Sequence, residues 1–159
     1  GAPTMGAISD KIRRRKLPMI VGATGAAIMM CVILYAPHLS MNTLNICVFV
    51  LGLFYSAQTI VFAVGRELSP ASSAGTAIAL TNMIVMIGAM ILQPLVGRLL
   101  DLSLRYHHAG DIPQGIAMNQ VHWLYSAADY RLAMSIIPVG IMTAVFSTFF
   151  IRETHAKPN

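Results

Sequence analysis

The chain has 159 residues, of which 56% are hydrophobic and 11% are charged, and its formal net charge is +5. This balance excludes an ordinary soluble domain, in which about a quarter of the residues are charged. The positive charge does not indicate a nucleic-acid partner, because much of it lies in one run at residues 11–16, directly before an apolar segment. Such a run is typical of the inner edge of a membrane span, so we expect the lipid bilayer as a partner and no nucleic acid.

Four long apolar runs predict an all-α, polytopic membrane protein with four transmembrane helices. The predicted spans cover residues 17–36, 44–65, 74–96 and 130–151. A helix that rises about 1.5 Å per residue needs roughly 20 residues to cross a hydrocarbon core of about 30 Å. Pro37 should end the first helix, Ser69 and Pro70 should begin the third, and Ser126 should cap the last, which would then begin near Ala127.

The distribution of Lys and Arg predicts the orientation of the spans. The predicted loop 9–16, the connection containing Arg66 and the C-terminal tail hold most of these residues. The predicted outer segments, chiefly the loop 97–129, hold the remaining few. The positive-inside rule therefore predicts that loop 9–16 and both chain ends are cytoplasmic. Binding of anionic lipid headgroups by the basic run is a compatible second role.

No residues predict catalysis, a cofactor or a metal. Cys31 and Cys47 lie in different spans without a nearby cysteine or histidine, which favours packing over a disulfide or a metal site. His107, His108 and His122 could collect a metal in the outer loop, but their spacing matches no known ligand pattern. We expect solvated loop histidines and no enzyme.

Polar side chains separate two spans from the others. The second span carries Tyr55, Gln58 and Thr59, and the third carries Asn82 and Gln93. Asn82 and Gln93 are eleven residues apart and share one helix face at about 100° per residue. Hydrogen bonds between helices could explain any one of these residues. Because amide side chains concentrate in two spans, we favour a shared cavity wall formed by all five residues.

A motif at residues 6–16, GAISDKIRRRK, adds a more specific signal. It resembles the cytoplasmic signature of the major facilitator superfamily, Gly-x-x-x-Asp-(Arg/Lys)-x-Gly-(Arg/Lys)-(Arg/Lys). The matching residues are Gly6, Asp10, Lys11, Arg14 and Arg15. Arg13 stands where the family prefers glycine, as is typical of the weaker second copy of the motif. A generic basic turn is the alternative reading of this segment.

Further segments resemble the C-terminal half of the same superfamily: residues 66–70 (RELSP), 93–97 (QPLVG), 128–131 (ADYR) and 152–154 (RET). The resemblance implies that the chain is the C-terminal portion of a longer transporter and that its spans are helices 9–12, part of a six-helix half. It implies secondary active transport of a small solute across a bacterial cytoplasmic membrane by alternating access. The further partners it implies are a coupling proton or sodium ion and the remainder of the transporter chain.

The resemblance also assigns roles to the two groups of residues. The five residues of the second and third spans would line the solute cavity, and the five matching motif residues would form a conformational gate in the cytoplasmic loop. A self-standing four-helix membrane protein is the alternative, either an oligomeric small exporter or a non-transporting interaction protein. Against a small exporter, none of the four spans contains the buried acidic residue that such proteins need.

Overall fold

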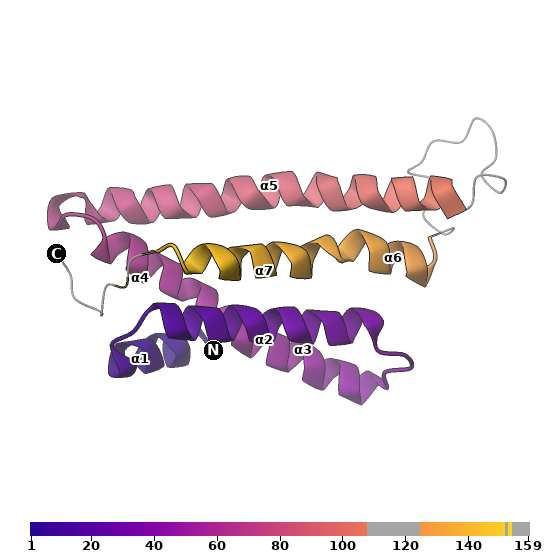
Figure 1. The fold of residues 1–159 in the computed structure, drawn as a ribbon, viewed down its shortest axis with the longest axis horizontal. Helices are drawn as coiled ribbons and strands as arrows, with labels where there is room; N and C mark the ends of the chain where they lie inside the picture. Colours follow the sequence, from indigo (N-terminus) through magenta and orange to yellow (C-terminus); the bar gives the residue numbers. More distant parts are fainter. Residues whose placement is uncertain (108–124, 152, 154–159) are drawn as a thin grey trace.

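The computed structural model describes residues 1–107, 125–151 and 153, and this part of the chain is helical and contains no strand (Figure 1). The helices are α1 (Ala2–Ile12), α2 (Lys16–Tyr35), α3 (Met41–Tyr55), η1 (Ser56–Thr59), α4 (Ile60–Glu67), η2 (Ala71–Ser73), α5 (Ala74–His107), α6 (Ala127–Met134) and α7 (Ile136–Thr148). The two η elements are short 3₁₀ helices. The predicted all-α fold class is confirmed.

Four helical segments are long and apolar enough to span a membrane, as predicted. They are Lys16–Tyr35, Met41–Glu67, Ala71–His107 and Ala127–Thr148. At most 22% of the residues in the most apolar part of any segment are buried within the described structure. Apolar side chains that face outward all round are expected of helices whose solvent is lipid.

Helix α2 packs against both α3 and α7, and small side chains make these contacts possible. Gly22 lies against the junction of α3 and η1, where an added Cβ would stand 2.3 Å from the Cβ of Ala57. An added Cβ at Gly25 would stand 2.5 Å from the ring of Phe54. Ala26 and Ala27 are also buried. Close backbone approach at small residues is the usual way in which helices associate in a bilayer.

Helix α5 contacts the rest of the bundle mainly near its two ends (Figure 1). Its first turns pack against α4, where Gly65 lies against the hydroxyl of Thr81. Its last turns pack against α6, where Ser103 and Leu104 are buried. None of the residues in its most apolar part is buried within the described structure. The middle of α5 therefore presents its side chains outward.

The expected loop at residues 9–16 is shorter than predicted, because α1 continues to Ile12. Arg13 ends this helix in the left-handed conformation, with a φ of 54°. Glycine adopts this conformation at no steric cost, whereas a side chain there is strained. The backbone thus explains why the resembling motif has glycine at this position. Only residues 13–15 connect α1 to α2.

Two other boundaries also differ from the prediction. Helix α5 runs through Pro94 and on to His107, so the helix does not end at residue 96. An apolar sequence with leucine at several positions after Pro94 continues the helix, and a membrane helix tolerates an internal proline. Ser69 does not cap the third segment, because its hydroxyl donates to the carbonyl of Gly65. Ser126 does cap α6, which begins at Ala127 as predicted.

Candidate functional site

Arg15 is the centre of a polar network at the end of the bundle where α1 turns into α2. Its side chain is only 9% exposed although it lies in a short connection. The guanidinium faces Glu67, the last residue of α4, in a two-pronged arrangement. Nε lies 3.1 and 3.2 Å from the two carboxylate oxygens, and Nη2 lies 2.5 Å from Oε1. Charge-assisted hydrogen bonds of this kind are stronger than those between neutral groups.

The same guanidinium also binds the end of α1. Nη1 donates to the carboxylate of Asp10 at 2.6 Å and to the hydroxyl of Ser9 at 2.9 Å. Ser9 is fully buried and its hydroxyl in turn donates to the carbonyl of Arg14. The Asp10 side chain, by contrast, is 65% exposed. The buried ion pair therefore joins Arg15 to Glu67, and Asp10 adds a contact from the solvent side.

Glu153, which follows α7, is the last member of the network, and it binds backbone groups. Its carboxylate accepts hydrogen bonds from the backbone N–H groups of Arg15, at 2.7 Å, and Lys16, at 3.3 Å. These groups lie at the start of α2, where the helix dipole favours a negative charge. Lys16 also reaches the carbonyl of Phe149 at 3.2 Å. We refer to Ser9, Asp10, Arg15, Glu67 and Glu153 as the Arg15 network.

The Arg15 network joins segments that are distant in sequence. The hydrogen bonds that Arg15 donates to Glu67 raise the pKa of Arg15, and burial opposes this rise. The guanidinium therefore stays charged at any physiological pH. Figure 1 shows the start of α2, the end of α4 and the end of α7 at the same end of the bundle. The buried guanidinium thus joins α1 and α4 to the start of α2, and Glu153 joins the segment that ends with α7 to the same place through backbone N–H groups.

The structure assigns different positions to the five motif residues. Asp10 and Arg15 contact each other, and Gly6 lines the same small pocket as both. Lys11 and Arg14 have exposed side chains. The sequence motif does not reveal that Glu67, Glu153 and Ser9 belong to the network. The available signal was that each glutamate ends or follows a predicted span on the same side as the basic run.

The five predicted cavity residues all have exposed side chains in the described structure. Tyr55, Gln58 and Thr59 lie at the junction of α3, η1 and α4, and Asn82 and Gln93 lie on α5. Thr59 also lines a polar pocket of about 300 Å³ together with residues of the Arg15 network. That pocket is lined by Gly6, Asp10, Arg15, Thr59, Ile60, Ala63, Arg66 and Glu67. One predicted cavity residue therefore lies beside the Arg15 network, and the structure does not gather the five into one pocket.

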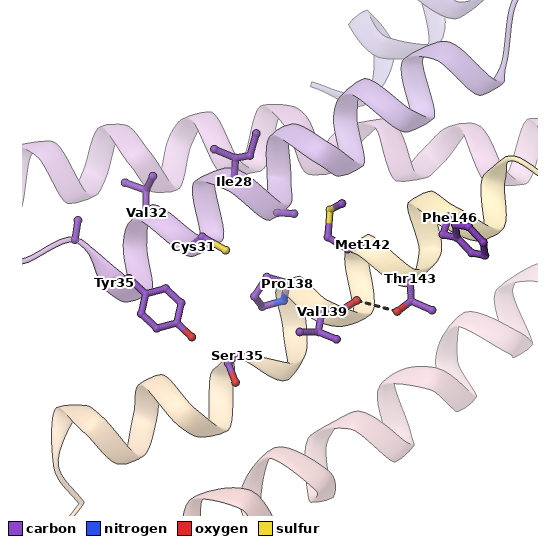
Figure 2. A pocket seen from close by; sticks show the side chains of 12 residues that line it. Ile28, Cys31, Val32, Tyr35, Ser135, Pro138, Val139, Met142, Thr143 and Phe146 are labelled. Carbon is purple, nitrogen blue, oxygen red and sulfur yellow. Dashed lines mark hydrogen bonds between the residues drawn. The ribbon is translucent and has the colours of Figure 1, made fainter.

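A larger hollow of about 1040 Å³ lies between α2 and α7 (Figure 2). Its walls are almost entirely apolar, and the few hydroxyls come from Tyr35, Ser135 and Thr143. Figure 2 shows Thr143 bonded back to the carbonyl of Val139 in its own helix. None of the five predicted cavity residues lines this hollow. Its chemistry suits hydrocarbon, whereas the exposed amides of η1 and α5 suit a polar solute.

Comparison with known proteins agrees with the motif and the helical architecture. A model of the Major Facilitator Superfamily matches residues 1–159. No curated protein and no solved structure gives a significant match. Members of this superfamily are multi-pass membrane proteins that transport small solutes and are not enzymes. The chain, with its four membrane-length helical segments, therefore belongs to the Major Facilitator Superfamily.

Proposed function

We propose that this chain is the C-terminal part of a secondary transporter that moves a small solute across a bacterial cytoplasmic membrane by alternating access. The observation that carries the proposal is the Arg15 network, in which the buried guanidinium joins α1 and α4, and Glu153 after α7 binds the backbone at the start of α2. Such a network is stable when all its contacts are made, and breaking the buried ion pair alone is costly. It therefore favours two discrete conformations over a continuous range of conformations. Alternating access needs this behaviour.

In this mechanism the network is the cytoplasmic lock. With Arg15 bound to Glu67 and Asp10, the ends of α1 and α4 are held beside the start of α2. When α4 moves away, Arg15 loses the Glu67 carboxylate and retains its contacts with α1, the exposed carboxylate of Asp10 and the hydroxyl of Ser9. Water entering the polar pocket beside Thr59 would then solvate both charges and offset part of the cost. The lock thereby couples the movement of α4 to the opening of the cytoplasmic side.

The solute would contact the exposed polar side chains of the second and third segments. Tyr55 can stack on a ring and donate a hydrogen bond, and the Gln58 and Asn82 amides can both donate and accept. Thr59 and Gln93 extend this surface toward the lock and along α5. None of the five is ionisable at neutral pH, which suits a neutral or weakly charged solute. The coupling proton or sodium ion would bind elsewhere in the transporter.

Transport by the native polypeptide tests the proposal. Proteoliposomes are screened with a panel of labelled small solutes, and the solute that gives uptake is used for equilibrium exchange. Asp10→Asn should slow exchange while it leaves solute affinity unchanged. Lys11→Gln is the matched control, because this motif residue has an exposed side chain outside the network. An exchange rate in Asp10→Asn equal to that of the wild type would show that Asp10 does not contribute to the gate.

A self-standing four-helix protein is the competing function, and the size of the native polypeptide decides between the two. An antibody against residues 152–159 should detect a band in source membranes well above the 17.2 kDa mass of this sequence. A band at 17.2 kDa would instead indicate that the four helices exist alone, as an oligomer or as an interaction protein.

A further inference from the structure

The end of the bundle opposite to Arg15 holds a second polar cluster that the proposed transport mechanism does not use (Figure 1). Its centre is Asp129, which is fully buried although it lies in the first turn of α6. Its Oδ2 accepts hydrogen bonds from the backbone N–H and the hydroxyl of Ser126, at 2.8 and 2.7 Å. Its Oδ1 accepts a hydrogen bond from the Ser103 hydroxyl of α5 at 2.5 Å. A single carboxylate thus caps α6 and fastens it to α5.

His107, the last residue of α5, completes this cluster. Its Nδ1 lies 3.2 Å from Oδ1 of Asp129 and 3.3 Å from the Ser103 hydroxyl. The ionised carboxylate can only accept hydrogen bonds, and Ser103 already uses its proton to bind that carboxylate. Nδ1 must therefore carry the hydrogen. The side chain of His107 is 46% exposed, so the second nitrogen, Nε2, is available to exchange protons with water.

The charges around His107 leave Asp129 as its closest ionic partner in the described part of the chain. The other titratable or charged residues in the last turns of α5 are Asp101, Arg105 and Tyr106, and those around the start of α6 are Tyr125, Tyr130 and Arg131. The ring of Tyr106 contacts that of His107. The carboxylate of Asp101 is bound by the Tyr125 hydroxyl at 2.5 Å. This hydrogen bond raises the pKa of Tyr125 to about 12, so the phenol remains a donor. Arg105 and Arg131 have exposed side chains.

We propose that Ser103, His107, Ser126 and Asp129 form a proton-sensitive latch between α5 and α6. Uptake of a proton at Nε2 converts the neutral hydrogen bond from His107 into an ion pair with the buried carboxylate. The latch is therefore stronger when the imidazole carries a second proton, and it is weaker when the imidazole is neutral. Histidine is the side chain that most readily changes its charge near physiological pH. The inference needs no solute and does not depend on the transport proposal.

Hydrogen exchange tests the latch without any change to the buried carboxylate. After correction for intrinsic rates, the amides of α6 should lose roughly threefold protection between pH 5.5 and pH 8 in the wild type. His107→Gln should abolish this dependence, and it should fold because His107 is half exposed. His38→Asn is the matched control, since His38 is an exposed histidine in the α2–α3 connection. A pH dependence that persists in His107→Gln would refute the latch.

Discussion

Replacement of Arg15 by methionine should destabilise the bundle by about 3–5 kcal/mol. Methionine is unbranched and replaces the aliphatic stem of arginine, but it lacks the guanidinium that binds Glu67, whose side chain is 9% exposed. Removal of one member of a buried ion pair costs this much because the other charge remains desolvated. The contribution of Asp10 should be smaller, about 0.2–1 kcal/mol, since its side chain is 65% exposed.

A double-mutant cycle separates the ion pair from its surroundings. Glu67→Gln removes the charge and keeps the shape of the side chain. The double variant, Arg15→Met with Glu67→Gln, therefore has no buried carboxylate at position 67. The double variant should therefore be less destabilised than the sum of the two single variants, by about 2 kcal/mol. Reversible unfolding in mixed micelles with increasing SDS, followed by far-UV circular dichroism, gives each free energy. A coupling energy below about 0.5 kcal/mol would show that the pair does not lock the bundle.

Three further substitutions test the local structure with the same unfolding measurement. Arg13→Gly should stabilise the chain by about 0.5–1 kcal/mol, because glycine relieves the left-handed conformation at φ 54°. Gly22→Ala should destabilise it by about 1–3 kcal/mol, because the new methyl would stand 2.3 Å from the Cβ of Ala57. Ser126→Ala should cost about 0.5–2 kcal/mol, because it removes the capping box of α6.

Each of these variants has a matched control. Arg14→Gly should not stabilise the chain, since Arg14 does not have a positive φ. Gly88→Ala should be neutral or slightly stabilising, because no atom lies within 4 Å of an added Cβ at that position. Ser72→Ala removes an exposed serine from η2 and should have little effect. Equal effects for a variant and its control would contradict the contact assigned to the variant.

The membrane-length helices could be predicted from the sequence because they depend on a local property. A run of roughly 20 apolar residues signals a span without reference to any other part of the chain. The ends were harder to place, as α5 shows. The apolar run predicted a span over residues 74–96, whereas the helix continues to His107 and its last turns pack against α6. Tertiary contacts of this kind cannot be recognised from a short stretch of sequence.

The partners of Arg15 could not be predicted for a related reason. The motif identified a basic run but not which of its members turns inward. That choice depends on Glu67, 52 residues away, and on Glu153, 138 residues away. Asp129 is similar, since the sequence placed it at the border of a span and the structure buries it against Ser103, 26 residues earlier. Long-range pairing of charges follows from the fold, and composition and spacing do not encode it.

The solute path can be tested most directly by cysteine labelling in membranes. On a background in which Cys31 and Cys47 are replaced by alanine, single cysteines are introduced at Gln58 and Asn82 and, as controls, at Ile46 and Ile84. All four side chains are exposed in the described structure, so only the medium around them differs. A membrane-impermeant maleimide should label the cysteines at Gln58 and Asn82 and leave the two controls unlabelled. Absence of labelling at all four positions would show that the amides do not face water, and would contradict a polar path along η1 and α5.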